Sequence, residues 1–429
     1  MEDLLMEKTA TKSMSAMADG LVGSEIIKLA NDVNEKIKQG NQIYNLTIGD
    51  FNPNIFPIPE NLKNEIVSAY HRGHTNYPAA NGIAELRKSV SQYLFRKGGV
   101  KYTENEVLIA GGGRPLIYGA YQVILDPGDS VIFPTPSWNN NHYCHIVGAK
   151  PIQIETVAQN NFMPTAEEIK PYIEEANLIS LCSPLNPTGT TFSKDGLEAI
   201  CDLVLEENQR RGSSRKPVYI LFDQIYWQLT FGETQHYNPV ILRPEIKDYV
   251  VFIDGMSKAF SGTGIRVGWG FGPLPIINKM KSMLSHLGAW APKAEQVATA
   301  KFLANVNHTD HFIEEINTRI QKRLTAFYNG FKMLKSMGHK VDAIAPQAAM
   351  YLTVKIDIKG SRTKDGSILE STDDITSFLL NQGGIALVPF NAFGADKEST
   401  WYRLSVGTTS MEDIDGFFDS LRNVLSQIS

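Results

Sequence analysis

The 429-residue chain contains only three cysteines, Cys144, Cys182 and Cys201, and no CxxC pair. An odd number of cysteines with apolar neighbours does not make a disulfide framework, so the sequence predicts free thiols in a cytoplasmic compartment. His142 and His145 flank Cys144 at a spacing that metal ligands use, but further ligands are missing from this motif. We therefore interpret the two histidines as packing or cleft-edge residues and expect no metal.

Long apolar runs and blocks of like charge are also absent. No stretch approaches 18 uninterrupted apolar residues, so we expect no membrane-spanning helix. Lys and Arg total 41 against 46 Asp and Glu, and the net charge is −5. With no basic block, nucleic acid is not an expected partner. The first 20 residues mix acids and bases without an apolar stretch, which predicts neither a secretory signal nor a transit peptide.

What the sequence does contain is an alternation of short β-rich apolar runs with longer amphipathic segments. The apolar runs occupy residues 107–112, 130–135, 151–156, 179–185, 218–223 and 249–255, and helix-like segments between or beside them occupy 84–97 and 193–211. Such an alternation indicates right-handed βαβ units. It predicts an α/β protein whose mainly parallel sheet is sandwiched by helices.

The two ends of the chain follow a different pattern. A helix is expected over residues 24–40, and past residue 275 long helices give way to a smaller α+β segment. We therefore predict a large domain at 56–300 and a small domain formed by both ends, 1–55 and 301–429. The cleft between them, near the carboxyl ends of the strands, is the expected ligand site.

Two glycine- and proline-rich motifs follow predicted strands. In GGGRPL (111–116) a helix is expected to begin at Arg114 or Pro115, and its free N–H groups would attract an anion. In SPLNPTG (183–189) turn-forming residues would hold the amide of Asn186 at a strand end. Each motif by itself could equally be a plain structural turn.

Two further motifs supply charged groups. Asp223 ends the apolar strand of VYILFDQIY, where a carboxylate needs a cationic partner unless it is a helix N-cap, and Tyr226 would face the same cleft. Lys258 follows a buried strand in a Gly/Ser-rich turn. A lone lysine is usually a surface residue, but burial would lower the pKa of this amine and make it a nucleophile. Arg266, eight residues later, could bind a dianion.

Together these motifs supply the groups that bind pyridoxal 5′-phosphate (PLP). An amine can bond its aldehyde and a carboxylate can pair with its pyridine nitrogen. An amide and a phenol can contact its ring hydroxyl, while a helix start and an arginine can hold its phosphate. This combination fits PLP and little else.

The same motifs resemble those of fold-type I PLP enzymes of the class I/II aminotransferase family, from about residue 24 to the C-terminus. The resemblance implies that Lys258 forms a Schiff base with PLP and moves the substrate proton, and that Asp223 pairs with the pyridine nitrogen. It also implies that Asn186 and Tyr226 contact the ring oxygen. By the same resemblance, Arg266 and the backbone amides of Gly113 and Arg114 hold the phosphate.

The resemblance extends to four residues outside those motifs. Trp138 matches the aromatic that stacks on the cofactor ring, and Tyr77 matches the tyrosine that reaches the phosphate of a neighbouring subunit, which implies a homodimer with shared active sites. Arg403 matches the arginine that binds the substrate α-carboxylate as a bidentate fork. Gly49 resembles the glycine whose backbone meets the same carboxylate.

Three positions depart from the family pattern. Gly255 stands where many relatives have a phosphate-binding serine, and Ser257 is a candidate substitute. The segments 345–351 and 388–394 replace more glycine-rich versions. These departures leave the cofactor residues intact and affect the expected substrate pocket.

The reaction expected from the resemblance is ping-pong transamination between an L-amino acid and a 2-oxo acid. An arginine on the α-carboxylate disfavours decarboxylation, since that group stays anchored. A C–S lyase on the same scaffold remains the alternative, because PLP alone does not choose the reaction. Arg114 could bind the distal carboxylate of aspartate or glutamate, or could be a solvent-facing residue at a helix start.

Overall fold

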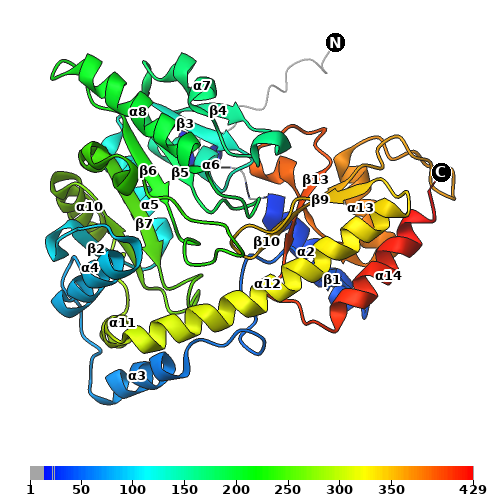
Figure 1. Ribbon diagram of the computed structural model, residues 1–429, viewed down its shortest axis with the longest axis horizontal. Helices are drawn as coiled ribbons and strands as arrows, with labels where there is room; N and C mark the ends of the chain where they lie inside the picture. Colours follow the sequence, from blue (N-terminus) through cyan, green and yellow to red (C-terminus); the bar gives the residue numbers. More distant parts are fainter. Residues whose placement is uncertain (1–13, 22, 24, 429) are drawn as a thin grey trace, which may run out of the picture.

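A seven-stranded sheet forms the centre of the larger part of the molecule (Figure 1). The computed structural model describes residues 14–428 apart from positions 22 and 24, so residues 1–13 of the predicted N-terminal arm lie outside it. The strand order is β2-β8-β7-β6-β5-β3-β4. Only β8 runs antiparallel to its neighbours. The strands are β2 (Val107–Ala110), β3 (Ser130–Thr135), β4 (Lys150–Glu155), β5 (Ala176–Cys182), β6 (Tyr219–Asp223), β7 (Val250–Gly255) and β8 (Gly268–Phe271).

Helices cover both faces of this sheet, which confirms the predicted α/β sandwich. On one face the core includes residues of α4 (Ala84–Gly98), α8 (Lys194–Arg211) and α11 (Lys293–Ala304). On the other it includes residues of α5 (Gly113–Ile124), α6 (Asn140–Val147) and α10 (Leu274–His286). Except for the edge strand β4, which is largely exposed, the strands are buried along most of their length because both faces are packed. Helix α3 (Glu60–His71) packs on α11. Three short helices are α1 (Ala16–Asp19), α7 (Ala166–Ile169) and α9 (Pro239–Leu242).

A smaller sheet, of order β12-β13-β10-β9, is antiparallel throughout. Residues from near the start of the described chain lie beside this region (Figure 1). Tyr44 in β1 pairs with Ile385 in β11, and Val33 of α2 is buried with Leu380 and Ala386. The elements are α2 (Glu25–Lys38), β1 (Tyr44–Asn45), α12 (Val306–Ser336), β9 (Val341–Ala343), β10 (Tyr351–Ile356), α13 (Thr372–Gly383), β11 (Ile385–Ala386), β12 (Val388–Pro389), β13 (Trp401–Ser405) and α14 (Asp413–Leu425).

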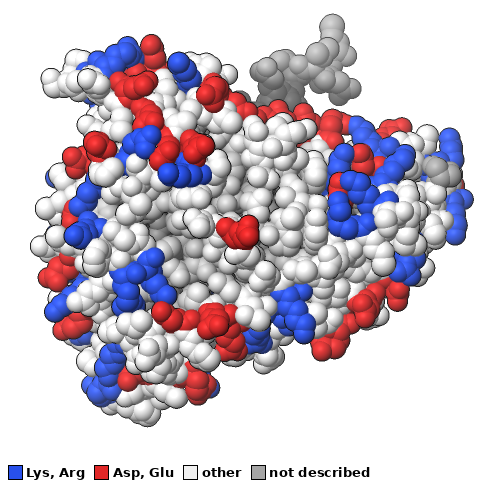
Figure 2. All heavy atoms as spheres, viewed as in Figure 1, with Lys and Arg blue, Asp and Glu red and all other residues white. Residues whose placement is uncertain are grey.

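The long helix α12 connects the two parts of the molecule (Figure 1). It packs on α11 and on β9, β10 and α14, and Phe312 contacts the hydrophobic cores of both parts. Among the described helices, none is both long enough and apolar enough to cross a membrane. Figure 2 shows side chains of both charge signs around the rim of one face and few charges at its middle.

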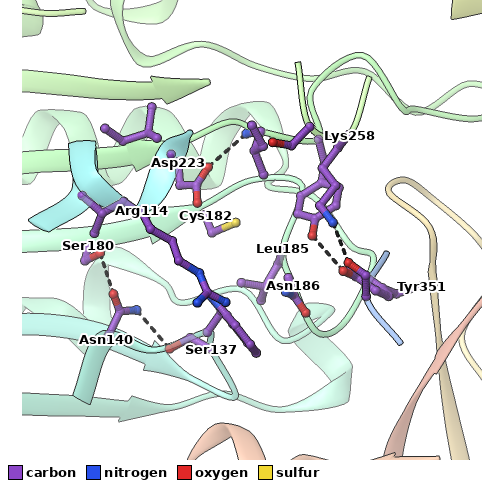
Figure 3. Close-up of a pocket in the computed structure, with 18 of the residues that line it drawn as sticks. Arg114, Ser137, Asn140, Ser180, Cys182, Leu185, Asn186, Asp223, Lys258 and Tyr351 are labelled. Atoms are coloured by element: carbon purple, nitrogen blue, oxygen red, sulfur yellow. Dashed lines mark hydrogen bonds between the residues drawn. The ribbon is translucent and has the colours of Figure 1, made fainter. Parts of the chain in front are cut away.

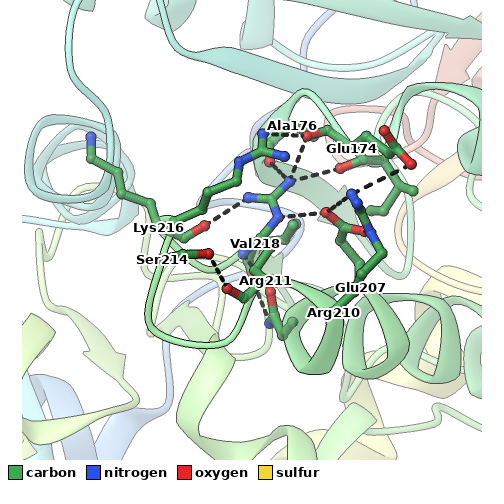
Figure 4. A network of polar contacts seen from close by, with 11 residues as sticks. Glu174, Ala176, Glu207, Arg210, Arg211, Ser214, Lys216 and Val218 are labelled. Atoms are coloured by element: carbon green, nitrogen blue, oxygen red, sulfur yellow. Dashed lines mark hydrogen bonds and ion pairs between the residues drawn. The ribbon is translucent and has the colours of Figure 1, made fainter.

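Arg211, the last residue of α8, binds the backbone of the two segments that lead into β5 and β6 (Figure 4). Its buried guanidinium donates to the carboxylate of Glu207 at 2.6 Å and to the carbonyl of Lys216 at 2.7 Å. It also donates to three carbonyls that precede or open β5, those of Ile173, Glu174 and Ala176. One side chain therefore satisfies carbonyls from two separate loops, those of Ile173 and Ala176 being in buried residues.

We expect Arg211→Met to lower the free energy of unfolding by about 3–5 kcal/mol, because it leaves several carbonyls without their donor and removes one of the two arginines that pair with the buried Glu207. Urea denaturation followed by circular dichroism measures the change. Arg210→Met is the matched control, since Arg210 pairs with the same Glu207 but its side chain is 51% exposed. A much smaller loss is expected for this control. Equal losses in the two variants would contradict the interpretation.

Candidate active site

A cavity of about 600 Å³ lies at the carboxyl ends of β5, β6 and β7. The structure places every predicted site residue except Tyr77 around it: Gly49, Gly113, Arg114, Trp138, Asn186, Asp223, Tyr226, Lys258, Arg266 and Arg403. Asn186 follows β5, Asp223 ends β6 and Lys258 follows β7. Since these three strands are parallel neighbours, their ends deliver the three side chains to one edge of the sheet (Figure 3).

Lys258 lies on the same side of the site as Tyr351, with its amine directed at the N-terminal segment (Figure 3). Its Nζ donates to the carbonyl of Gly49 at 2.6 Å and lies 5.8 Å from the centroid of the Tyr226 ring. Burial lowers the pKa of Lys258 to about 8, while the carboxylate of Asp50 opposes this shift. A substantial fraction of this amine is therefore neutral and nucleophilic near pH 8.

Asp223 provides the carboxylate of the site. Burial raises the pKa of Asp223 to about 6, although the backbone N–H of Ile225, which donates to it at 3.0 Å, and the charge of Lys258 lower it. A raised pKa means that the carboxylate lacks full compensation in the cofactor-free protein. A bound cation next to Asp223 would supply that compensation.

The pKa of Asp223 leads to a prediction about stability. The folded protein holds this proton more tightly than the unfolded chain between about pH 4 and pH 6. The contribution of Asp223 to the stability of the cofactor-free protein therefore falls as pH rises through that window. It stays at this lower level at higher pH. We expect Asp223→Asn to gain about 3 kcal/mol relative to wild type between pH 4 and pH 7, at about 1.4 kcal/mol per pH unit.

Urea unfolding of the two cofactor-free proteins at both pH values measures this gain. Asp419→Asn is the control, because the side chain of Asp419 is 69% exposed. A difference between Asp223→Asn and wild type that does not change with pH would contradict the assigned environment.

Tyr226 meets a second tyrosine that sequence reasoning missed. The hydroxyl groups of Tyr226 and Tyr351 are 2.8 Å apart, and both side chains are buried. Tyr351 opens β10 in the small sheet and is the last residue of the atypical segment 345–351. Only its place in that segment hinted at a role, since its contact with Tyr226 joins residues 125 positions apart.

Arg403, on β13, is a buried cation without a carboxylate partner in the described part of the chain. It is 2% exposed and donates to Asn186 Oδ1 at 2.9 Å and to the carbonyl of Thr47 at 2.6 Å. Its buried Nε has no hydrogen-bond partner. Burial lowers the pKa of Arg403, so an anion that enters the cavity would meet a poorly compensated positive charge.

The opposite end of the cavity presents a helix N-terminus. Helix α5 begins at Gly113, earlier than the sequence suggested, because Gly112 adopts φ 98° and forms its N-cap. A side chain at Gly112 would collide with the guanidinium of Arg266. That guanidinium donates to the carbonyls of Gly111 at 2.7 Å and Thr263 at 2.8 Å. Free N–H groups and a cation therefore converge on one anion-binding corner.

The structure explains the unusual Gly255. A Cβ at this position would lie 2.8 Å from Cα of Gly268 and 2.9 Å from the carbonyl of Val267. Strands β7 and β8 are thus too close for a serine here. Ser257, two residues on, lines the cavity near the same corner and can supply the hydroxyl.

Arg114 has an exposed side chain that enters the cavity (Figure 3). Its guanidinium lies 5.4 Å from the centroid of the Trp138 ring, the aromatic predicted to stack on the cofactor. Beyond them, Asn140 connects Ser137, at 3.1 Å, with Ser180, at 2.9 Å. These polar residues of the cavity wall were not among the predicted site residues.

Tyr77 lies apart from the cavity of its own chain. It is 80% exposed, and its ring packs edge-on against Trp290 at a centroid distance of 5.1 Å. Within the described residues, no group of three or more His, Cys, Asp or Glu side chains is arranged to hold a metal ion. Cys144, Cys182 and Cys201 are free thiols.

The donor set of the cavity fits PLP. The amine of Lys258, the undercompensated carboxylate of Asp223 and the anion-binding corner at Gly113 and Arg266 match the aldehyde, the pyridine nitrogen and the phosphate. Arg403, with its unpartnered Nε, is left over for a second anion. The site therefore has groups for both a cofactor and a carboxylate of a substrate.

Comparisons with known proteins agree with this site. Residues 41–421 match the family described as aminotransferase class I and II. An aspartate aminotransferase of Bacillus sp. (strain YM-2) is 29% identical over 407 residues, covering 92% of this chain and 97% of that protein. The crystal structure of the Rhizobium meliloti aspartate aminotransferase superposes with a TM-score of 0.89 at 26% identity, covering 97% of this chain and 99% of that one.

The Thermus thermophilus aspartate aminotransferase with maleate superposes with a TM-score of 0.84, also at 26% identity, covering 96% of this chain and 99% of that one. These relatives are aminotransferases, which favours transamination over the C–S lyase alternative. The predicted fold, cofactor and reaction class are thereby confirmed. The chain belongs to the aminotransferase class I and II family and is a PLP-dependent aminotransferase.

Proposed function

We propose that the chain transfers the amino group of an acidic L-amino acid, aspartate or glutamate, to a 2-oxo acid. The observation that carries the proposal is that two arginines, Arg114 and Arg403, line the cavity in addition to Arg266, which is assigned to the phosphate. A dicarboxylic substrate needs two such groups, one for each carboxylate. The solved structure of the Thermus thermophilus relative holds maleate, a dicarboxylate, which supports the same substrate class.

In this proposal Lys258 holds the cofactor covalently and moves the proton of the substrate Cα. When bound, PLP supplies an electron sink that stabilises negative charge at that carbon. Asp223 keeps the pyridine nitrogen protonated, and the buried environment of the carboxylate strengthens that pairing. Asn186 and Tyr226 would contact the ring oxygen of the cofactor, and Trp138 would supply an aromatic surface for its ring.

The phosphate and the substrate are assigned to opposite ends of the cavity. Arg266, the backbone N–H groups of Gly113 and Arg114, and the hydroxyl of Ser257 hold the phosphate. Arg403 binds the α-carboxylate, with Asn186 fixing the plane of its guanidinium and Gly49 lying alongside. Anchoring that carboxylate keeps it in the product and directs bond breaking to the Cα proton.

We further propose a homodimer in which Tyr77 reaches the phosphate of the neighbouring subunit. The support is that Tyr77 is a largely exposed aromatic that does not line the active-site cavity of its own chain. The free thiols support a cytoplasmic location. We also propose that the large domain spans residues 56–300, as the sequence suggested. With these limits α12, which begins at Val306, belongs to the small domain.

The visible spectrum of the purified protein tests the reaction and the donor together. We expect PLP-loaded protein to lose its visible band when aspartate or glutamate is added alone, and to regain it with a 2-oxo acid. Release of pyruvate and ammonia without an acceptor would instead identify a lyase. A band that responds only to aliphatic or aromatic amino acids would contradict the acidic substrate.

Arg114→Gln tests the distal carboxylate site. We expect kcat/KM for aspartate to fall about 10- to 100-fold, because one charge-assisted interaction is worth about 1.5–3 kcal/mol. The value for alanine should change less than about threefold. Arg114→Lys keeps the charge but not the fork and should give an intermediate loss. Equal losses for aspartate and alanine in Arg114→Gln would contradict this assignment.

A further inference from the structure

Asp254 has a buried carboxyl group near the edge of the large sheet that carries the active-site cavity, on the face of the sheet away from that cavity. It lies in β7, one strand over from Asp223, and is 1% exposed. In the described part of the chain no lysine, arginine or histidine forms an ion pair with it. Its partners are N–H groups: the backbone of Gly255 at 2.7 Å, the indole of Trp227 at 2.9 Å and the indole of Trp269 at 3.2 Å.

Three N–H donors hold the side chain of Asp254 in place. Burial and the charge of Asp223 raise the pKa of Asp254 to about 8, while the N–H groups of Gly255, Trp227 and Trp269 lower it. All three partners donate, and the oxygens of a carboxyl group accept N–H groups in both its protonated and its charged form. Asp254 is therefore a fixed acceptor for both indoles.

Trp227 belongs to the turn that carries two of the cofactor residues. At the end of β6 the side chains of this turn point into two different cavities. Those of Asp223, Ile225 and Tyr226 line the active-site cavity, whereas those of Gln224 and Trp227 line a separate cavity of about 300 Å³. The backbone of this turn is bonded to its neighbours at its start, from Gln224 N to the carbonyl of Ile253 at 2.9 Å and from Ser183 N to the carbonyl of Asp223 at 3.0 Å, whereas Trp227 N donates within the turn, to the carbonyl of Gln224. Side chains on its rear face must therefore help to fix its position.

We propose that Asp254 is a positioning residue which, through the indole of Trp227, holds the turn so that Asp223 and Tyr226 meet the cofactor ring. The inference rests on the roles proposed above for Asp223 and Tyr226. It adds a carboxylate and an indole that touch neither cofactor nor substrate. Asp254 thus influences the active site from the other face of the sheet.

Trp269 provides a matched control within the molecule. Its indole donates to the same oxygen, Asp254 Oδ2, and Tyr93 packs against both indoles at centroid distances of 6.0 and 6.4 Å. Trp269, however, lies in β8, where it sits in register with Ile109 on one side and Asp254 on the other. The backbone ladder fixes Trp269 whether or not its indole is bonded.

The experiment compares Trp227→Phe, Trp269→Phe and Asp254→Asn as full-length cofactor-free proteins. PLP affinity is measured by equilibrium titration, and the pH midpoint of the visible band by absorption of the loaded proteins. Thermal unfolding of the cofactor-free proteins reports the structural cost. We expect Trp227→Phe and Asp254→Asn to bind PLP about tenfold more weakly, one tenfold step being about 1.4 kcal/mol, and to shift the midpoint. Trp269→Phe should change affinity less than about twofold while losing similar thermal stability.

A double variant tests whether Asp254 acts on the cofactor site through Trp227. If Asp254 acts through Trp227, Asp254→Asn should weaken PLP binding little further in a Trp227→Phe background. Fully additive losses, or equal losses in Trp227→Phe and Trp269→Phe, would overturn the proposal. Should Trp227→Phe not fold, Asp254→Asn must weaken PLP binding and Trp269→Phe must not.

Asp223→Asn serves as the reference for the underlying assignment. If Asp223→Asn leaves PLP affinity and the band midpoint unchanged, the proposed role of Asp223 fails. If Asp223→Asn changes them and Trp227→Phe does not, the positioning role of Asp254 alone is wrong.

Discussion

Lys258→Ala is expected to reduce the rate of transamination by about 10⁴-fold or more. The substitution removes the group proposed to transfer the Cα proton, and positioned general acid–base groups contribute about 10²–10⁴-fold alone. It also removes the amine whose pKa burial lowers to about 8, and with it the covalent attachment of PLP. Single-turnover kinetics with aspartate and the absorption spectrum of the loaded protein measure both losses.

Lys279→Ala is the control for this experiment, because Lys279 lies exposed on α10. Its kinetics and spectrum should match those of the wild type. Retention of the visible band by Lys258→Ala, or a rate loss below about tenfold, would show that another group is the nucleophile.

Arg403→Leu should lower kcat/KM by about 10²–10⁴-fold for every amino acid and 2-oxo acid tested. Two charge-assisted hydrogen bonds to the α-carboxylate are lost, each worth about 1.5–3 kcal/mol. All substrates share that carboxylate, so the loss should not depend on the side chain, in contrast to the selective effect expected for Arg114→Gln. Steady-state kinetics with aspartate, alanine and their 2-oxo acids test this expectation.

The stability of Arg403→Leu distinguishes binding from folding. Arg403 is buried without a carboxylate partner, so removing its uncompensated charge should offset the loss of its hydrogen bonds to Asn186 and Thr47, and the thermal stability of the cofactor-free protein should change little. Arg422→Leu, at an arginine with 42% side-chain exposure on α14, should leave kinetics unchanged. A large loss of stability together with activity in Arg403→Leu would assign Arg403 a structural role instead.

The sequence predicted much of the site because parallel strands impose order on it. Asn186, Asp223 and Lys258 could be placed together from three apolar runs, since the carboxyl ends of β5, β6 and β7 share one edge. The start of α5 was displaced because only a glycine with positive φ, Gly112, leaves room for Arg266. That close approach depends on atoms 154 positions apart in the chain.

The residues that were missed are those whose partners are distant in sequence. Tyr351 became a candidate only when its hydroxyl was found 2.8 Å from that of Tyr226. Asp254 looked like one more polar residue at a strand end until Trp227 and Trp269 were seen to donate to it. No periodicity or motif length encodes such contacts, because they form between elements.

The sequence alone determined the alternation of strands and helices, and with it the α/β sheet and the edge at which Asn186, Asp223 and Lys258 meet. Local spacing and burial specify these features, since a strand of four to seven apolar residues must be covered on both faces. Tertiary structure alone decided where Arg114 and Arg403 point, why position 255 must be glycine, and which side chains support the cofactor residues from behind. Those outcomes depend on packing between segments that no local pattern records.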